Sequence, residues 1–379
     1  MKPPQLLISC GEASGDLYAA ELLKALATRR PSLTAFGLGG AQSEAGGMEL
    51  VVRLEEVSVI GLVEVVRKLP AIAGAMKRLC SAAEARRPDL AVLIDFSGFN
   101  LRLARRLKAL GIPVLYYVSP QVWAWRRGRI RAIRETVDEM LVILPFEKEF
   151  YEREGVKVSY VGHPLVDLVR VSEEREAFFA RLGLDPSRRL LIMLPGSRRR
   201  EIELHVPILR RAIDELARKH PELQFAVSRA PTIPADLLSH QLGTTLDRVR
   251  ILEGPVYDGL AHADAAVVAS GTATVEAALS ETPMVVVYRA GRATYLLGKP
   301  FVKVPFFSMV NLIAGEELVP ELIQDAMTPT SVVDRVTRLL DEDAAEAMRR
   351  GLRDVKRKLG GGGASARAAE AVLSRFELS

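Results

Sequence analysis

The segment Leu6–Asp16 reads Leu-Leu-Ile-Ser-Cys-Gly-Glu-Ala-Ser-Gly-Asp, an apolar run that ends in a turn of small residues. An amphipathic helical stretch, Leu17–Thr28, begins directly after the turn. An apolar run that passes through a tight turn into a helix is the repeating unit of a parallel sheet covered by helices. Small residues at such a turn let a ligand approach the backbone at the helix N-terminus. The segment therefore predicts an α/β fold.

Apolar runs alternate with helical stretches through both halves of the chain. In the first half, strands are predicted at Leu6–Ser9, Thr34–Leu38, Leu90–Ile94, Val114–Val118, Glu139–Leu144 and Val158–Val161. In the second half, they are predicted at Leu190–Leu194, Gln224–Ser228, Val249–Leu252, Ala265–Ala269 and Met284–Tyr288. This pattern predicts two doubly wound α/β domains that face each other across a cleft.

The 379 residues are too many for one compact domain. We expect an N-terminal domain over residues 1–168 and a second domain over residues 169–342. Residues 343–379 are predicted to form C-terminal helices around the glycine run Gly360–Gly363, a flexible link. The last helix, Ser365–Phe376, could therefore dock on the N-terminal domain or on a partner chain, as in a homodimer.

Composition excludes several classes of protein. Two cysteines, Cys10 and Cys80, cannot form a disulfide framework, and no cysteine or histidine spacing is typical of zinc. No apolar run approaches the roughly 18–20 residues of a membrane span. The apolar run after Met1–Pro4 is also too short for the core of a signal peptide. We expect a cytoplasmic protein that reaches a membrane only peripherally.

Basic residues are unevenly distributed, although the net charge is only +5. Between Phe96 and Arg134 there is no acidic residue, and the basic ones are Arg102, Arg105, Arg106, Lys108, Arg126, Arg127, Arg129, Arg131 and Arg134. A second cluster consists of Arg188, Arg189, Arg198, Arg199 and Arg200. Such local excess suits phosphate groups or an anionic lipid surface. RNA-binding motifs are missing, so we expect no nucleic acid partner.

Acidic residues follow predicted strands in the first half, where α/β sheets bind ligands. Asp95 directly follows Leu90–Ile94 and could accept a proton from a substrate hydroxyl if partial burial raises its pKa. Glu12 and Asp16 would repel a pyrophosphate, so their turn suits a hydroxyl-rich ligand. The structural alternatives are a capped turn at Gly11–Asp16 and a helix N-cap at Asp95.

Two apolar segments near basic residues have both a structural and a membrane interpretation. Trp123 and Trp125 precede a run of arginines, which is typical either of packing or of a rim that faces lipid or sugar. An apolar stripe at helical spacing is expected to stop at Pro70 and consists of Leu62, Val65, Val66 and Leu69. The stripe faces either the core or a membrane and acyl chains.

Two turns after predicted strands of the second half suit a nucleotide diphosphate. The first turn contains Gly196, Ser197 and Arg198. Its backbone N–H groups and one guanidinium could bind a phosphate. The second turn contains Ser270, Gly271 and Thr272. It begins a helix whose N-terminus would bind a pyrophosphate, and Glu276, about one turn further on, could accept hydrogen bonds from a ribose.

No metal constellation accompanies these turns in the sequence. The histidines are scattered without ligand spacing and are His163, His205, His220, His240 and His262. The charge of a diphosphate leaving group would be balanced instead by Arg198 and the helix N-terminus. We therefore expect neither a metal ion nor another cofactor.

Six strings occur in one order along the chain: Gly11–Asp16, Tyr117–Trp125, Leu144–Glu147, Gly162–Pro164, Leu194–Arg198 and Asn311–Gly315. Together with the two α/β domains, they resemble the lipid-A-disaccharide synthase family, from near residue 5 to at least residue 325. The resemblance implies the GT-B type of glycosyltransferase fold, with two Rossmann-like domains. The string Ser-Pro-x-Val-Trp-Ala-Trp is highly specific, whereas Gly-His-Pro is shared with other GT-B proteins.

The resemblance implies an inverting hexosyltransferase of lipid A and lipopolysaccharide biosynthesis. It would transfer 2,3-diacylglucosamine from UDP-2,3-diacylglucosamine to the 6-hydroxyl of 2,3-diacylglucosamine 1-phosphate. The products would be a β(1→6) disaccharide 1-phosphate and UDP. The N-terminal domain would hold the acceptor and face the cytoplasmic surface of the inner membrane, and the second domain would bind the UDP-sugar.

On the acceptor side, the resemblance implies that Asp95 is the general base. Glu12 would orient a sugar or help to activate the acceptor. Some family members carry a second carboxylate where this chain has Gly98. A carboxylate pair that shares a proton cannot operate here, so Asp95 would act alone or with Glu12, and which of the two is the base stays open.

On the donor side, the resemblance adds roles to the two turns. Arg198 and the Gly271–Thr272 helix end would stabilise the departing UDP, and Glu276 would hold the ribose. Asn311 would also line the donor site. This role is implied only because its position matches the family's motif.

Two rival classes explain part of the sequence. Another GT-B enzyme, such as a UDP-GlcNAc transferase or 2-epimerase, would turn over an unacylated UDP-sugar without a lipid acceptor. A non-catalytic module that binds an anionic surface or RNA would explain the arginine clusters, and its binding would depend steeply on salt. That second class leaves both phosphate turns and Asp95 unexplained.

Overall fold

The computed structural model describes residues 3–57, 62–124, 127–291, 295 and 304–377. The chain divides into two compact units, and each has its own parallel sheet. The first unit is Met1–Asp167 together with Leu359–Ser379, and the second is Leu168–Lys358. Residues 343–358, which the sequence grouped with the last helix, therefore lie in the second unit.

The first sheet has the strand order β3-β2-β1-β4-β5-β6-β7, and every neighbouring pair is parallel. Its strands are β1 (Gln5–Cys10), β2 (Thr34–Gly39), β3 (Met48–Arg53), β4 (Leu90–Ile94), β5 (Val114–Tyr117), β6 (Glu139–Val142) and β7 (Val158–Tyr160). The six predicted strands are confirmed. The edge strand β3 was missed because its apolar run Leu50–Val52 is short and is flanked by the exposed, charged Glu49 and Arg53.

The second sheet has the order β10-β9-β8-β11-β12-β13 and is also parallel. Its strands are β8 (Arg189–Leu194), β9 (Leu223–Arg229), β10 (Val249–Glu253), β11 (Ala265–Ala269), β12 (Met284–Tyr288) and β13 (Glu321–Ile323). The five predicted strands are confirmed, and the three-residue edge strand β13 was missed. The central strands are buried on both faces, which is why they read as continuous apolar runs rather than as alternating ones.

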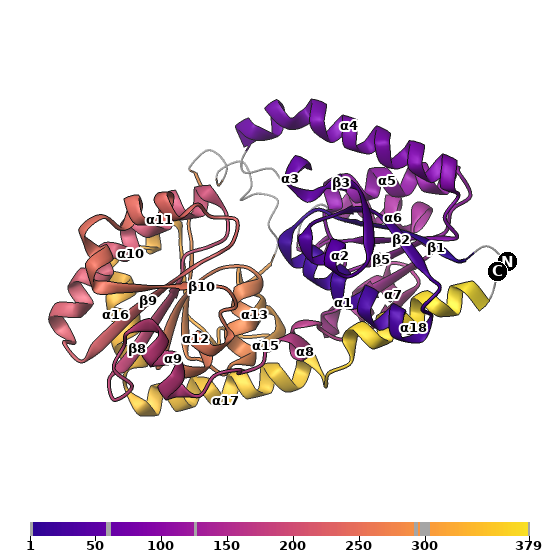
Figure 1. The fold of residues 1–379 in the computed structure, drawn as a ribbon. Coiled ribbons are helices and arrows are strands. Elements are labelled where there is room, and N and C mark those ends of the chain that lie inside the picture. Colours follow the sequence, from indigo (N-terminus) through magenta and orange to yellow (C-terminus); the bar gives the residue numbers. More distant parts are fainter. Residues whose placement is uncertain (1–2, 58–61, 125–126, 292–294, 296–303, 378–379) are drawn as a thin grey trace. The chain divides into compact units, whose positions relative to one another are not determined.

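Helices connect the strands and flank both faces of each sheet. In the first unit they are α1 (Ala13–Arg29), α2 (Ala41–Ala45), α3 (Leu54–Val57), α4 (Leu62–Arg86), α5 (Ser97–Ala109), α6 (Ile130–Thr136), α7 (Pro145–Arg153) and α18 (Ala364–Glu377), with the short α8 (Leu165–Leu168) at the boundary. Figure 1 shows α4 and α5 on one side of the first sheet and α1 and α18 on the other. The expected stop at Pro70 is wrong, because α4 continues through this residue.

In the second unit the helices are α9 (Arg175–Leu182), α10 (Arg199–Lys219), α11 (Ala235–Leu242), α12 (Tyr257–His262), α13 (Thr272–Leu279), α15 (Met309–Ala314), α16 (Pro329–Leu339) and α17 (Glu342–Leu359). Short 3-10 turns are η1 (Arg127–Arg129) in the first unit, and η2 (Gly243–Arg248) and η4 (Gln324–Ala326) in the second. No helix in the described ranges is both long enough and apolar enough to cross a membrane.

The helix α18 returns to the first unit and packs against α1 of the same chain (Figure 1). At its start, the Asp167 carboxylate accepts hydrogen bonds from the N–H groups of Gly363, at 2.7 and 2.9 Å, and of Ala364, at 3.0 Å. Along its length, Arg29 donates to the Ala366 carbonyl at 2.8 Å. These contacts complete one side of the first unit with the last helix of the chain.

In each sheet the order in which the chain adds strands reverses once. This reversal marks the point at the carboxyl ends of the strands where a ligand is expected to bind. In the first sheet the chain runs outward from β1 to β3 and then returns to β4 on the other side of β1. In the second it runs outward from β8 to β10 and then returns to β11 beside β8. Ligands of such sheets bind outside the carboxyl ends of the strands at this switch point. The predicted site turns follow β1, β4, β8 and β11, the four strands that flank the two switch points.

Candidate functional site

The loop after β4 holds its backbone in the left-handed region, with φ of 44° at Asp95 and 46° at Phe96. Residues other than glycine adopt this region rarely, and they keep it where surrounding contacts over-determine it, often at functional sites. The Asp95 carbonyl accepts hydrogen bonds from the Tyr116 hydroxyl and from Asn100 Nδ2, the latter at 2.9 Å. The Asp95 N–H donates to the Tyr117 carbonyl at 3.1 Å. The position of Asp95 is therefore fixed through its backbone.

Asn100 joins the two strands at the switch point and was missed by the sequence analysis. It is fully buried on α5. Its Oδ1 accepts from Ser9 Oγ at 2.7 Å, and its Nδ2 donates to the Ser9 and Ile94 carbonyls, each at 3.1 Å. The available signal was its position, because Asn100 lies at helical spacing with the apolar residues Phe96, Leu103 and Leu107. It ties the end of β1 to the end of β4.

The turn after β1 lies against the Asp95 loop. A Cβ at Gly11 would overlap the ring of Phe96, so glycine is required there by this close approach. The next residue, Glu12, is exposed at the N-cap of α1. The two candidate carboxylates, Glu12 and Asp95, therefore come from loops in direct contact.

Asp16 is a structural residue. It is buried, and its carboxylate accepts from the N–H groups of Gly40, Gln42 and Ser43 at 2.8, 3.0 and 3.1 Å. The Ser43 hydroxyl also donates to it at 2.5 Å. Asp16 thus caps α2, and of the two acids in this turn only Glu12 is exposed to a ligand.

The Ser119–Trp123 segment after β5 is organised by the buried Glu147. Its carboxylate accepts from Ser119 Oγ at 2.5 Å, from Trp123 Nε1 at 3.0 Å and from the Leu144 N–H at 3.1 Å. Burial outweighs these hydrogen bonds and raises the pKa of Glu147 to about 6. The Trp123 ring packs edge-on against Phe146, with ring centres 4.9 Å apart. For Trp123 the packing interpretation therefore holds.

The predicted membrane-facing features fall partly outside the described residues. Trp125 and Arg126 lie outside them, and so do the side chains of Leu62, Val65 and Val66. The Leu69 side chain is described and is 49% exposed. Leu69 is therefore not part of the core.

In the second unit, the turn after β8 is held by the carboxylate of Glu201, which lies in the first turn of α10. The N–H groups of Ser197 and Arg198 donate to Glu201 Oε2 at 3.0 and 3.2 Å. Gly196 has φ of 123°, and a Cβ there would overlap the Glu201 carboxylate. The N–H groups expected to bind phosphate are thus occupied by Glu201, which the sequence analysis missed although glutamate at the third helical position is a capping signal. The Arg198 guanidinium is exposed and lies 3.5 Å from Glu201 Oε1.

His205 bridges the turn after β8 to the end of β12 and was also missed. It is fully buried; its Nδ1 lies 2.7 Å from the Pro195 carbonyl, and its Nε2 lies 2.9 Å from the Arg289 N–H. A carbonyl only accepts and an N–H only donates, so the proton is on Nδ1 and Nε2 accepts. Burial lowers the pKa of His205, which keeps the ring neutral.

The turn after β11 begins α13 as predicted, with Gly271 and Thr272 exposed. Gly271 has φ of 150°, and the space where its Cβ would lie is open. Ser270 Oγ donates to the Phe307 carbonyl at 2.9 Å. The N-terminus of α13 is therefore accessible at the switch point.

Glu276 lies on α13, about one turn beyond Thr272, and is partly buried. Burial raises its pKa to about 7. The pKa of Tyr257 is raised to about 12, mainly by burial and further by the charge of Glu276. A carboxyl with a perturbed pKa beside a helix N-terminus is typical of a binding site.

Asn311 lies on α15 and holds the neighbouring backbone in place. It is fully buried; its Nδ2 donates to the Val319 carbonyl and to Glu321 Oε1, and its Oδ1 accepts from the Val319 N–H, each at 2.9 Å. Glu321 also accepts from the N–H groups of Phe307 and Ser308, each at 2.8 Å. Asn311 and Glu321 together hold the segment whose Phe307 carbonyl bonds to Ser270.

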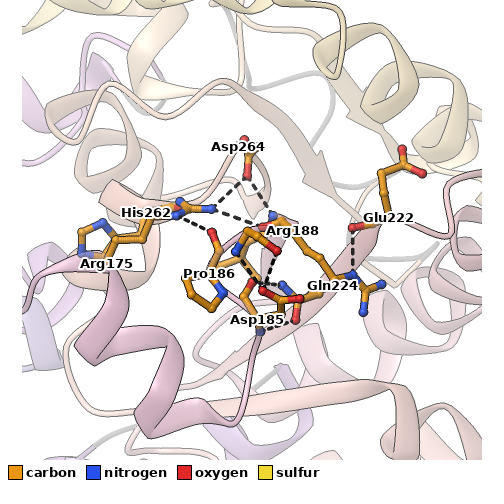
Figure 2. Close-up of polar contacts among 10 residues, drawn as sticks. Arg175, Asp185, Pro186, Arg188, Glu222, Gln224, His262 and Asp264 are labelled. Carbon is orange, nitrogen blue, oxygen red and sulfur yellow. Dashed lines mark hydrogen bonds and ion pairs between the residues drawn. The ribbon is translucent and has the colours of Figure 1, made fainter.

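The arginines of the second cluster lie at opposite ends of β8. Arg188 donates to the Pro221 and Leu223 carbonyls at 2.6 and 3.2 Å, and Arg189 donates to the Leu340 carbonyl at 2.6 Å. Figure 2 shows Arg188 in a polar network with Arg175, whose guanidinium donates to backbone carbonyls. This network lies at the amino end of β8, whereas Arg198 follows its carboxyl end.

Metal-ligating side chains are dispersed. Within the described ranges, no three His, Cys, Asp or Glu side chains come together in a group that could hold a metal ion.

Comparison with protein families gives a match to the family described as lipid-A-disaccharide synthetase over residues 6–374. The lipid-A-disaccharide synthase of Myxococcus xanthus (strain DK1622) is 47% identical over 372 residues, which are 98% of this chain and 97% of the relative. That of Anaeromyxobacter dehalogenans (strain 2CP-1 / ATCC BAA-258) is 45% identical, over 97% of each chain.

Solved structures show the same fold at low identity. A putative UDP-N-acetylglucosamine 2-epimerase from Listeria monocytogenes has a TM-score of 0.71 at 14% identity, covering 100% of this chain and 98% of that one. CalG4, the calicheamicin glycosyltransferase, has a TM-score of 0.60 at 18% identity, covering 100% and 99%. The prediction of a GT-B type α/β fold with two Rossmann-like sheets is confirmed.

Proposed function

The chain belongs to the lipid-A-disaccharide synthetase family, and from this membership we propose how its two sheets divide the reaction. It is a UDP-sugar glycosyltransferase of lipid A disaccharide synthesis. The alternatives of an unacylated-sugar enzyme and of a non-catalytic module are not favoured, because full-length relatives carry the lipid-A-disaccharide synthase name.

We propose that the donor is UDP-2,3-diacylglucosamine and that the acceptor is the 6-hydroxyl of 2,3-diacylglucosamine 1-phosphate. The reaction takes place at the cytoplasmic surface of the inner membrane and needs no metal ion. The observation that carries this proposal is the fixed, left-handed backbone at Asp95, which sets a carboxylate at the switch point of the first sheet.

On the acceptor side, the Asp95 carboxylate takes the proton from the 6-hydroxyl. The acceptor oxygen then attacks C1 of the donor sugar on the face opposite UDP, which inverts the configuration at C1. Glu12, exposed on the adjoining turn, orients the acceptor sugar through its hydroxyl groups.

On the donor side, the exposed N-terminus of α13 at Gly271 and Thr272 binds the diphosphate, and Glu276 accepts hydrogen bonds from the ribose. The Arg198 guanidinium stabilises the charge that develops on UDP as the bond to C1 breaks. Gly196 and Ser197 hold Arg198 in place through the Glu201 cap rather than by their own contacts with phosphate.

The pKa of Glu276 gives this site a pH dependence. Because the charged carboxylate is the better acceptor for ribose hydroxyls, nucleoside affinity should rise about tenfold between pH 6 and pH 8. Titration calorimetry with uridine avoids the titration of the UDP phosphate, and Glu276→Gln should bind weakly with no pH dependence. Uridine affinity that is constant over this range in the unchanged protein would contradict the role.

The same variant has an expected effect on stability. A carboxyl whose pKa is raised on folding favours its protonated form, so its contribution to stability falls as pH rises from the unfolded value through about 7. Glu276→Gln should therefore raise the melting temperature of the ligand-free protein at pH 8 and change it little at pH 4.5.

The test of the whole proposal is UDP release from UDP-2,3-diacylglucosamine in EDTA, with and without 2,3-diacylglucosamine 1-phosphate. We expect release only when the acceptor is present, despite the chelator. Release without acceptor would indicate a hydrolase or an epimerase-like enzyme. Loss of release in EDTA, with recovery on added divalent metal, would overturn the metal-free mechanism.

A further inference from the structure

Arginines near the carboxyl edge of the second sheet are paired with carboxylates. The pairs are Arg198–Glu201 at 3.5 Å, Arg199–Glu203 at 3.7 Å, Arg200–Glu203 at 3.0 Å and Arg229–Glu253 at 2.6 Å. Each guanidinium is thus partly neutralised within the chain. In particular, Glu201 takes up both the charge of Arg198 and the N–H groups of its turn.

Arg289 differs from these arginines. It follows β12 directly and is partly buried. Within the described part of the chain its guanidinium makes no hydrogen bond and no ion pair, and its backbone N–H bonds to His205. Removing part of a charged group from water without a partner costs free energy. An unpaired, partly buried guanidinium at a ligand edge is therefore explained best by an anion that binds there.

The backbone of Arg289 is tied to both donor turns. The Ser270 N–H donates to the Val287 carbonyl at 2.9 Å, so β12 stays beside β11 up to the start of the turn after β11. Arg289 is two residues beyond Val287 along this edge. On the other side, His205 connects the Arg289 N–H to the Pro195 carbonyl, next to Gly196. Both turns of the proposed donor site are thus linked to the backbone of Arg289.

We propose that Arg289 binds the diphosphate of the UDP donor, and that His205 is the positioning residue that fixes Arg289 relative to the Pro195–Arg198 turn. This inference rests on the proposed donor site. When the bond between C1 and the β-phosphate oxygen breaks, its electron pair goes to that oxygen, while the acceptor oxygen bonds to C1 and its proton goes to Asp95. A guanidinium can donate two parallel hydrogen bonds to the phosphate that receives the charge.

The test compares ligands that differ only in phosphate. Arg289→Gln should bind uridine like the unchanged protein but should bind UDP about tenfold to hundredfold more weakly. Arg289→Lys should recover part of the UDP affinity, because it keeps the charge and loses the paired donors. Arg211→Gln is the matched control: Arg211 is exposed on α10, and the variant removes the same charge with no effect on either ligand.

His205 is tested by two variants that each keep one hydrogen bond. His205→Gln can place an oxygen near the position of Nε2 and keep the bond from the Arg289 N–H. His205→Asn keeps only a donor for the Pro195 carbonyl. Among variants that fold, as judged by unchanged uridine affinity, we expect UDP affinity to be retained better in His205→Gln. Equal loss of UDP affinity in both would overturn the positioning role.

The possible outcomes distinguish a wrong role for Arg289 from a wrong donor site. If the unchanged protein binds no UDP, the donor site itself is wrong. If it binds UDP and Arg289→Gln binds UDP equally well, the donor site stands and the role of Arg289 is overturned. Equal weakening of uridine and UDP in Arg289→Gln would show a change in the fold of the site and would also overturn the diphosphate contact.

Discussion

Asp95→Asn should lower turnover about 10²–10⁴-fold, the usual contribution of a positioned general base. An amide cannot take the proton of the acceptor hydroxyl, so the acceptor stays a poor nucleophile. The loop should keep its shape, because the hydrogen bonds that hold Asp95 use its backbone carbonyl and N–H. Asparagine also tolerates a left-handed backbone better than most residues, which suits φ of 44°.

The measurement is the rate of acceptor-dependent UDP release, together with UDP affinity, which should not change. Glu12→Gln is the informative comparison, because Glu12 is the other carboxylate at this edge and lies on the adjoining turn. We expect turnover to fall less in Glu12→Gln than in Asp95→Asn. Full turnover in Asp95→Asn with an inactive Glu12→Gln would transfer the base role to Glu12.

Arg198→Ala should cost about 2.7–4 kcal/mol of transition-state stabilisation, by analogy with the loss of one oxyanion donor. That corresponds to a fall of about 10²–10³-fold in kcat. The Arg198 side chain is 56% exposed, and Glu201 would still accept the backbone N–H groups of the turn, so stability should change little. Loss of activity would therefore report on the guanidinium and not on the loop.

The matched control is Arg199→Ala. Arg199 is the next residue, is 50% exposed and is paired with Glu203 on the same helix. Arg199→Ala removes an equal charge at nearly the same place. If the donor is attracted only by the general positive charge of this region, both variants should lose activity alike. We expect near-normal turnover in Arg199→Ala. Near-normal turnover in Arg198→Ala as well would count against the leaving-group assignment.

The central strands could be predicted from the sequence because strands buried on both faces are continuous apolar runs. The edge strands β3 and β13 could not, since β3 carries exposed charged residues and β13 has only three residues. The positions of the candidate turns could be predicted for a related reason: a polar or glycine-rich turn after a buried strand marks the carboxyl edge, whatever the packing around it.

What the sequence did not reveal was the partner of each polar group. His205 meets the backbone of Arg289 only after α10 has packed along the sheet, and Arg188 and Arg198 look alike until their positions at opposite ends of β8 are known. Asp16 resembled a ligand group although its hydrogen bonds go to residues 40–43. Such pairings depend on the tertiary structure, which spacing along the chain does not encode.

The return of α18 to the first unit has a consequence for synthesis on the ribosome. The surface of α1 that α18 covers stays exposed to solvent until the whole of Leu168–Lys358 has been translated. The second unit can therefore complete its fold before the first. During that interval the first unit presents unfilled apolar surface to chaperones and to other nascent chains. Removing the segment after Gly363 should leave this surface uncovered permanently. The shortened protein should then aggregate through its first unit, while its second unit should still bind UDP.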